Sequence, residues 1–252
     1  NPERLLKDLK DLAQFGRLTT GVSRVSFSEA DVQARHWLKT QMERAGLNAE
    51  FDAVGNVHGR TNTDAKSVII GSHTDSVPVG GWLDGSLGVI YGLEIARSII
   101  ELGLANEIGI DVISFMDEEG TYLPCLGSKR FCRELGDDEL AKGQSPSGER
   151  LPDAVERSGF MGNPEMSIDR ARHLAYLEAH IEQGPRLEAS RKEIGIVTGI
   201  VGIRRFKLEI TGEADHAGTV PMSMRKDAWA AAIGLLHSLY KEIAKTKGPE
   251  SV

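Results

Sequence analysis

Apolar residues recur at helical spacing in two segments near the start of the chain. The spacing predicts a helix over 2–16, with Asn1 as its cap. A second helix is predicted over 28–46, because Ser28–Asp31 has the form of a capping box. From 47–53 apolar and polar residues alternate, which predicts a strand that a following segment could extend into a hairpin.

The middle of the chain has a strand–helix–strand pattern. A short β-branched run at 67–70 predicts a buried strand, 84–100 has helical spacing, and 107–116 predicts another strand. This order predicts a parallel pair joined by a right-handed crossover. The fold class that we predict is α/β: a mixed, largely parallel sheet flanked by helices.

The second half of the chain is less regular. The polar stretch 136–163, rich in Gly, Pro and Ser, predicts irregular structure with short helices. Strands are predicted at 174–181 and 194–200, a one-face-exposed strand at 206–210, and a helix over 225–245.

The pattern changes after Gly202, where one strand and one helix follow. These are too few for a stable domain of their own. We therefore predict an incomplete first domain over 1–200, the start of a smaller α+β domain over 201–252, and a chain that continues beyond Val252.

Composition narrows the classes of protein. The 252 residues are 40% hydrophobic and 27% charged, which is typical of a globular protein. A net charge of −7 argues against general nucleic-acid binding, and no apolar run is long enough to cross a membrane. Because no signal segment opens the chain, we expect a cytoplasmic protein. Cys125 and Cys132 match no metal-binding spacing and are expected to be buried or half-buried thiols.

Three polar clusters follow three of the predicted strands. They are Gly71–Asp75, Met116–Gly120 and Ala179–Gly184. In open α/β sheets the ligand crevice lies at the carboxyl ends of the strands, so these clusters should converge. Asp84, at the start of a predicted helix, should lie beside them.

One crevice would then hold two imidazoles and three carboxylates, those of His73, Asp84, Glu118, Glu119 and His180. Without a cation, adjacent buried carboxylates are forced to bind protons. A divalent metal relieves this, and a mixed nitrogen and oxygen donor set suits zinc, manganese, cobalt or nickel. A carboxylate that bridges two ions would make a two-metal site for activating water. Asp75 is placed to orient the imidazole of His73.

Each of these residues also has an ordinary structural interpretation. A single histidine after a strand is usually a satisfied surface or core residue, and a pair of glutamates is usually solvated. Asp84 alone could be a helix cap, and Asp75 alone a turn residue. The metal site is favoured because three strand-end clusters occur together.

Five motifs appear in order: Gly71–Pro78, Gly80–Gly85, Asp117–Gly120, His180–Pro185 and His216–Met222. They resemble the hydantoinase/carbamoylase branch of the dinuclear zinc-peptidase clan, which includes N-carbamoyl-L-amino-acid amidohydrolases, allantoate amidohydrolases and β-ureidopropionases. The resemblance runs from about Arg17 to the end of the chain. Its last two motifs are the most specific, since the wider clan of aminopeptidases and deacylases shares the others.

The resemblance implies a role for each matching residue. His73, Asp84 and His180 would hold one metal, and Asp84 would bridge to a second metal held by Glu119. Glu118 would be the general base and Asp75 the partner of His73. Gln183 would lie near the substrate. His216, in a lid or dimerisation domain, would polarise the scissile carbonyl, often across a dimer; otherwise it is a turn histidine.

Two family features are expected beyond Val252: a further ligand histidine and an arginine for the substrate carboxylate. His237 is no substitute, because it falls in an apolar-rich predicted helix. Ala179 stands where the family more often has leucine. The smaller side chain removes some packing and leaves His180 in place.

The function that the resemblance implies is metal-dependent hydrolysis of the carbamoyl or ureido C–N bond of N-carbamoyl amino acids or ureido acids such as allantoate. A homodimer through the lid domain is implied as well. One alternative is an aminopeptidase, dipeptidase or deacylase of the same clan. Another is a truncated, non-catalytic binding or dimerisation module.

Overall fold

The computed structural model describes residues 1–200, 202 and 206–245. The chain divides into two compact units, Asn1–Pro185 and Arg186–Val252. The predicted domain division at residue 200 stays a prediction.

The first unit is built on one five-stranded sheet. Its strands are β1 (Asn48–Phe51), β2 (Val57–Arg60), β3 (Ser67–His73), β4 (Gly109–Phe115) and β5 (His173–Leu177). The order across the sheet is β1-β2-β4-β3-β5. The pairs β1–β2 and β2–β4 are antiparallel, whereas β4–β3 and β3–β5 are parallel. The predicted mixed α/β sheet and the parallel β3–β4 pair are therefore confirmed.

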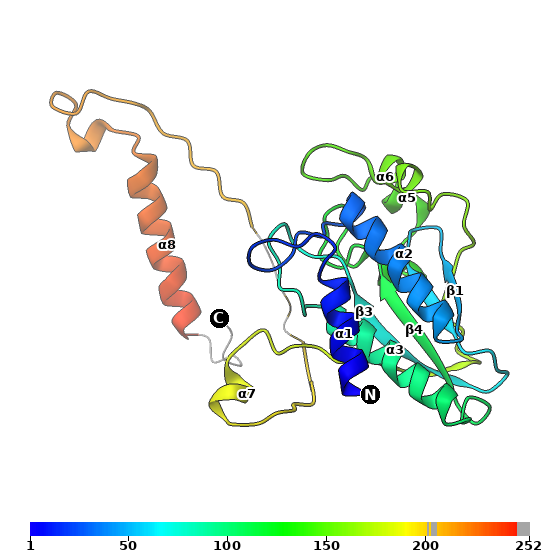
Figure 1. Cartoon of the computed structure of the whole chain (residues 1–252). Coiled ribbons are helices and arrows are strands. Elements are labelled where there is room, and N and C mark those ends of the chain that lie inside the picture. The colour runs from blue at the N-terminus through cyan, green and yellow to red at the C-terminus, as the bar shows by residue number, and fades with distance from the viewer. Residues whose placement is uncertain (201, 203–205, 246–252) are drawn as a thin grey trace. The chain divides into compact units, whose positions relative to one another are not determined.

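Helices cover both faces of this sheet. They are α1 (Pro2–Leu12), α2 (Glu29–Arg44), α3 (Ser86–Glu101), α4 (Leu126–Phe131), α5 (Asp137–Leu140) and α6 (Leu151–Arg157). Figure 1 shows α1, α2 and α3 on one side of the sheet, where Ile70 and Val112 join their core. Successive strand residues point to opposite faces, so Ile69 and Ile113 pack with Phe131 of α4 on the other side.

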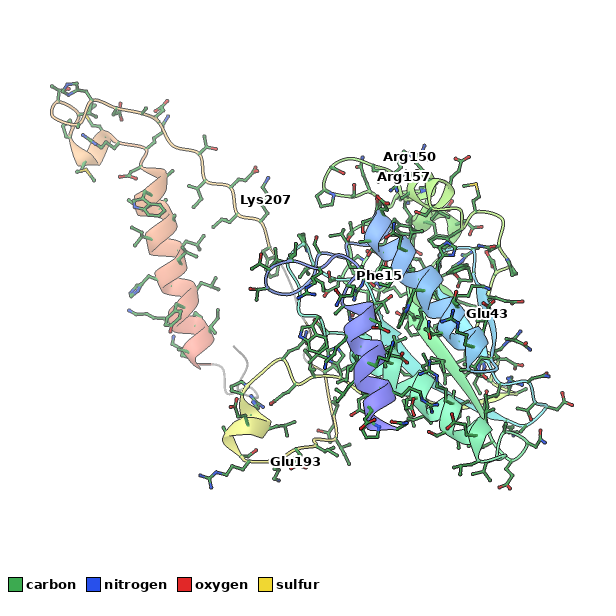
Figure 2. The ribbon with its side chains drawn as sticks, in the orientation of Figure 1. Phe15, Glu43, Arg150, Arg157, Glu193 and Lys207 are labelled. Carbon is green, nitrogen blue, oxygen red and sulfur yellow. The ribbon has the colours of Figure 1, made fainter. Side chains whose placement is uncertain are left out.

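The first two helices begin where the sequence predicts. The side chain of Asn1 accepts hydrogen bonds from the amides of residues 3 and 4, and Ser28 accepts one from Asp31 at 3.3 Å. These caps satisfy amides that have no partner inside the helix. Phe15, labelled in Figure 2, follows α1 and packs on Trp37 of α2 with 6.1 Å between ring centroids.

The second unit contains α7 (Arg186–Ala189), a 3₁₀ turn η1 (Met222–Met224) and α8 (Ala228–Lys245). The predicted start of α8 at Arg225 is three residues early. Asp227 is the physical reason, because its carboxylate accepts hydrogen bonds from the amides of Trp229 and Ala230 and so caps the helix there.

Two predicted strands are wrong. Residues 194–200 and 206–210 form no strand in the part of the chain that the structure describes. Ile196 is 90% exposed and Phe206 is 89% exposed, so neither apolar run meets a partner there. A β-branched or alternating run becomes a strand only when a second strand accepts its ladder. Arg205, which belonged to the predicted alternation, lies outside the described residues.

Three smaller predictions need correction or stay open. Asp84 precedes α3 and does not begin it, because Gly85 at φ +62° turns the chain before the helix starts. Cys125 is half-buried as expected, but Cys132 is exposed. Among the helices that the structure describes, none is long and apolar enough to cross a membrane.

Candidate metal centre

The three strand-end clusters converge at one edge of the sheet. Nitrogen and oxygen atoms of His73, Asp84 and His180 lie within 4.8 Å of one another, and so do those of His73, Glu118 and Glu119. We call these five residues the carboxyl-end cluster, because they follow or end β3, β4 and β5. The structure groups Glu119 with His73 and Glu118 rather than with Asp84.

His73 is the residue shared by both groups, and its ring is fixed on two sides. Its Nδ1 lies 3.0 Å from the backbone oxygen of Asp75, so this nitrogen carries the proton and donates it. In this tautomer the Nε2 atom has a lone pair available to a metal ion, and it lies 3.5 Å from Glu118 Oε2. Gly85 packs against the ring so closely that a Cβ there would lie 2.4 Å from it.

His180 has the same arrangement. Its Nδ1 lies 2.7 Å from the backbone oxygen of Ile181, which leaves Nε2 directed at Asp84 Oδ1, 3.2 Å away. That carboxylate oxygen is buried and has no hydrogen-bond partner among the described residues. The other oxygen of Asp84 accepts a hydrogen bond of 2.8 Å from the side-chain amide of Gln183. The backbone of Gln183 has a positive φ of +54°.

Glu118 and Glu119 come from the turn after β4. Asp117 shapes this turn, since its buried carboxylate accepts three backbone amides at 2.7–2.9 Å, those of residues 121, 122 and 123. Burial raises the pKa of Glu119, and the negative charges of Asp84, Glu118 and Asp75 raise it further against the opposing effect of His73. The site is therefore one that a cation would stabilise.

Asp75 lies beneath the cluster and is 1% exposed. Its carboxylate is 3.7 Å from His73 Nδ1, while the nearer contact of that ring is the Asp75 backbone oxygen. The side chain of Asp75 accepts hydrogen bonds of 3.1 Å from Ser26 and from the amide of Glu119. Asp75 thus touches both His73 and Glu119, although it orients the imidazole through its backbone.

These residues fit divalent metal ions. Both imidazoles have their proton on Nδ1 and present Nε2 to the same space, which is a common metal-binding arrangement. The buried Asp84 oxygen without a donor and the raised pKa of Glu119 are the local costs that a cation would remove. The donor set has two nitrogens and up to three carboxylates, which suits zinc, manganese, cobalt or nickel.

His216 belongs to the second unit, where it is exposed in a turn. Its Nδ1 accepts a hydrogen bond of 3.1 Å from the amide of Gly218. Arg225 donates to the backbone oxygens of His216 and Ala217 and so braces this turn from within the unit.

Two buried arginines support the site and were missed by the sequence analysis. Arg24 donates to the backbone oxygen of Thr74, which follows His73, and to the hydroxyl of Ser86, which follows Gly85. Arg35 donates to Phe115 O at 3.1 Å and lies 3.6 Å from Asp75 Oδ1. Their role at the site has no local sequence signal, because these partners are 40 to 80 positions away, although Arg35 also donates to Asp31 one helical turn earlier.

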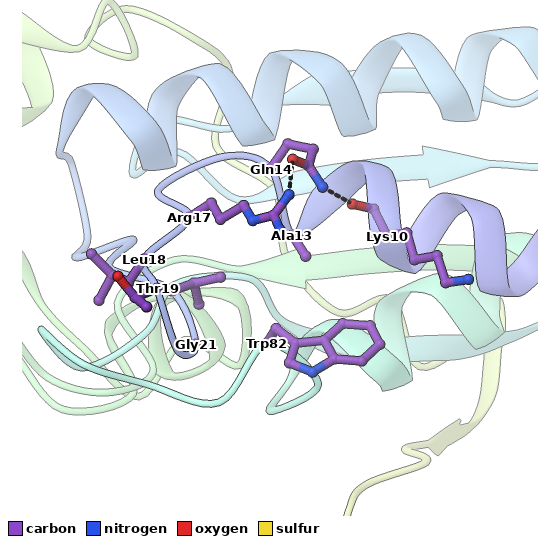
Figure 3. A pocket seen from close by; sticks show the side chains of 9 residues that line it. Lys10, Ala13, Gln14, Arg17, Leu18, Thr19, Gly21 and Trp82 are labelled. Carbon is purple, nitrogen blue, oxygen red and sulfur yellow. Dashed lines mark hydrogen bonds between the residues drawn. The ribbon is translucent and has the colours of Figure 1, made fainter.

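Two surface cavities lie beside the loops of the site. One, of about 490 Å³, is lined by Glu119 together with apolar side chains that include Phe27, Val77 and Pro78. The other, of about 400 Å³, lies where the loop after α1 meets Trp82; Figure 3 shows Lys10, Arg17 and Trp82 around it. Only the first cavity includes a member of the carboxyl-end cluster among its described lining residues.

Comparison with known proteins gives the class of this site. The sequence matches Peptidase family M28 over residues 54–145, a stretch that includes His73, Asp84, Glu118 and Glu119. Peptidase family M28 is therefore the class of protein that the fold and the site resemble.

Individual relatives narrow the class further. An N-carbamoyl-L-amino acid amidohydrolase from Geobacillus stearothermophilus is 37% identical over 97% of this chain and 61% of its own length. An allantoate amidohydrolase from Bacillus subtilis is 36% identical over 90% of this chain and 57% of its own. A solved hydantoinase/carbamoylase family amidase from Burkholderia phymatum has a TM-score of 0.89 and 47% identity over 100% of this chain and 62% of that one.

The chain is similar over its whole length to an amidase of the hydantoinase/carbamoylase family. This confirms the resemblance seen in the sequence motifs. The chain spans about three fifths of the length of the curated relatives just described.

Proposed function

We propose that this protein is a metal-dependent amidohydrolase that cleaves the carbamoyl C–N bond of N-carbamoyl amino acids. The observation that carries the proposal is the pair of Nε2 atoms, of His73 and His180, facing the carboxylates of Asp84 and Glu118. Similarity to N-carbamoyl-L-amino acid amidohydrolases over nearly the whole chain supports the choice of substrate.

The proposal includes two divalent metal ions. His73, Asp84 and His180 would hold one, and Asp84 would bridge to the second, which Glu119 would hold. When bound, such ions lower the pKa of water and polarise the substrate carbonyl. Asp75 would keep His73 oriented through the contact of its backbone oxygen with Nδ1.

Glu118 would move the proton. Its side chain is 42% exposed, so water and substrate can reach it. It would take a proton from the water that attacks the ureido carbonyl and deliver it to the leaving nitrogen as the C–N bond breaks. His216 would stabilise the negative charge on the carbonyl oxygen. The products are the free amino acid and carbamic acid, which decomposes to ammonia and carbon dioxide.

The substrate would be placed by Gln183 and by the cavity beside Glu119. Gln183 donates to Asp84, and its amide lies at the edge of the carboxyl-end cluster. Val77 and Pro78 give the cavity an exposed apolar part, which would favour an apolar amino-acid side chain over the polar ureido groups of allantoate, and Glu149 and Arg157 add charged groups to its lining.

We also propose a cytoplasmic homodimer formed through the second unit. Its helix α8 exposes apolar side chains, among them Trp229 at 75% and Tyr240 at 77%, and none of its described residues is buried. An apolar helix face of this kind favours a protein partner. Both cysteines are free thiols, which suits a reducing compartment. Light scattering of the purified protein would reveal the dimer, and a monomer would contradict it.

The reaction can be tested with purified protein loaded separately with Zn²⁺, Mn²⁺, Co²⁺ or Ni²⁺. We expect ammonia release from N-carbamoyl-L-phenylalanine or N-carbamoyl-L-methionine to exceed that from allantoate. Removing the metal with a chelator should stop it, and adding metal back should restore it.

Other results would point to the alternative functions. Faster hydrolysis of dipeptides or N-acetyl amino acids would favour a peptidase or deacylase. Full metal binding without hydrolysis of any of these compounds would favour a non-catalytic module.

A further inference from the structure

His180 stands in a weakly fixed part of the first unit. The β3–β5 ladder ends at the pair Ile70–Leu177, so His180 lies three residues beyond the last paired residue. In the described part of the chain β5 is an edge strand, and Leu177 is 55% exposed. The backbone ladder and core packing therefore do little to fix this histidine.

Beyond the end of the β3–β5 ladder, a hydrogen bond to the carboxylate of Glu178 holds this segment to β3. Glu178 is the first residue after β5, and its Oε1 accepts a hydrogen bond of 2.5 Å from Ser72 Oγ. Its Oε2 accepts one of 2.7 Å from the hydroxyl of Tyr176. Ser72 directly precedes His73 in β3, so Glu178 joins the loop of one histidine to the strand of the other.

Close packing by α3 reinforces the same junction. A Cβ on Gly88 would lie 2.7 Å from the backbone oxygen of Ala179 and 2.9 Å from Ser72 Cβ. The helix thus lies directly on the two segments that Glu178 joins. Glu178 and the contact of Gly88 with Ala179 are thus the holds on this segment that the structure shows, so a displacement of Glu178 leaves Ala179 and His180 with one of them.

Metal binding is sensitive to such displacements. The ring centroids of His73 and His180 are 6.5 Å apart, and His180 Nε2 lies 3.2 Å from Asp84 Oδ1. Metal–ligand distances must hold within about 0.2 Å, and groups that orient ligands typically change metal affinity about 10-fold to 100-fold. The carboxylate of Glu178 does not reach the metal groups itself and acts through the loop.

We propose that Glu178, held by Ser72, is a positioning residue that sets the place of His180 relative to His73 and Asp84. This inference rests on the metal centre of the proposed function. It assigns to Glu178 and Ser72 a role in metal binding that the sequence motifs did not suggest.

The test measures metal affinity and the ligand geometry of the bound metal. In the purified protein, Glu178→Ala should weaken binding of Zn²⁺ about tenfold or more by isothermal titration. It should also change the visible absorption of the bound Co²⁺, because that spectrum reports ligand geometry. Glu178→Gln keeps one acceptor oxygen and should fall between the alanine variant and the unsubstituted protein. Glu156→Gln, an exposed change of the same charge on α6, is the matched control and should bind metal normally.

Ser72→Ala gives an independent test that removes one hydroxyl. It should shift metal affinity and the cobalt spectrum in the same direction as Glu178→Ala, and the double variant should be little worse than either. Equal metal affinity and an unchanged cobalt spectrum in both single variants would overturn the inference. So would a loss explained entirely by a lower melting temperature of the metal-free protein.

The outcomes also separate this inference from the proposed reaction. If the unsubstituted protein binds metal but releases no ammonia, and Glu178→Ala still weakens binding, the positioning role stands and the reaction does not. If the unsubstituted protein binds none of the four metals, both proposals fail.

Discussion

Two regions of the same sheet bring histidine and carboxylate together, and only one has the character of a metal site. The first is the carboxyl-end cluster. The second, which we call the Asp111 cluster, lies near the amino ends of β3, β4 and β5 and consists of His58, Ser67, Asp111, Arg172 and His173. Each contains two histidines, but the Asp111 cluster has one acid and an arginine where the carboxyl-end cluster has three acids, so the two differ in charge as well as in how their protons and lone pairs are used.

In the Asp111 cluster the carboxylate is saturated with donors. Asp111 is fully buried and accepts hydrogen bonds from Ser67 and Arg172. His173 Nδ1 accepts the amide of Asp169, so its proton is on Nε2 and points at Asp111, 3.1 Å away. The nitrogen of His173 that faces the acid is thus a donor and has no lone pair for a metal, whereas His58 Nε2, 3.8 Å from Asp111 Oδ2, has no hydrogen-bond partner among the described residues.

The carboxyl-end cluster has the opposite pattern. His73 and His180 use Nδ1 as the donor to a backbone oxygen and face the acids with a lone pair. When the rings are neutral, two lone pairs and a buried oxygen face each other without a proton between them, which is unfavourable unless a metal ion or protonation of the rings supplies positive charge. Whether a backbone oxygen or a backbone amide lies against Nδ1 thus helps to decide which cluster can bind metal.

The largest expected effect comes from removing Asp84, whose Oδ1 has no donor among the described residues. Asp84→Asn should lower turnover of the N-carbamoyl substrate by more than about 100-fold, the upper range for loss of an orienting partner, because it removes a residue proposed to bind the metal directly. It should also lower the amount of bound metal measured by elemental analysis. If the variant kept its metal and its turnover, Asp84 would not be needed for metal binding.

The next effect is on stability and arises in the other cluster. Asp111→Ala should lower the free energy of unfolding by about 3–5 kcal/mol, because it leaves Arg172 and the buried polar groups without their acid. Urea unfolding would measure the change. The metal-to-protein ratio of the folded variant should stay at its normal value, and a loss of metal would contradict the separation of roles.

A smaller, pH-dependent effect comes from His58, which lies 3.8 Å from Asp111 and is buried. Burial lowers the pKa of His58 to about 4, well below its unfolded value of about 6.5, although Asp111 opposes the shift. The unfolded chain therefore binds the extra proton first, and stability falls as pH drops from about 6.5 to about 4.

Substituting this histidine would isolate its contribution. His58→Phe should reduce the loss of unfolding free energy between pH 7 and pH 4 by about 3 kcal/mol, following from the size of that shift. Urea unfolding curves at several pH values would measure it. An identical pH dependence in both proteins would contradict the assignment.

The sequence predicted the parts of the fold that depend on neighbours along the chain. Asn1 and Ser28 cap their helices as expected, because a cap needs only the next few amides. The β3–α3–β4 unit follows from a short apolar strand, a helical stripe and another strand. The meeting of the three strand-end clusters followed from the same pattern, because parallel strands end at one edge.

The predictions that failed depended on distant partners. Residues 194–200 have strand composition but no ladder in the described structure, and exposure of Ile196 shows that no core receives it. Gly85 was part of a motif, but only the fold shows that it packs on the ring of His73.

By itself, the sequence determined the order of the motifs, the set of acids and imidazoles that meet, and the element types other than the two strands expected at 194–200 and 206–210. The tertiary structure alone decided which nitrogen of each histidine carries the proton, that Glu178 joins β5 to β3, and that Arg24 and Arg35 brace the site from below. The physical reason is the distance along the chain between the interacting groups. Helix caps and alternation act between near neighbours, whereas the proton position depends on the one carbonyl or amide that folding brings against a ring.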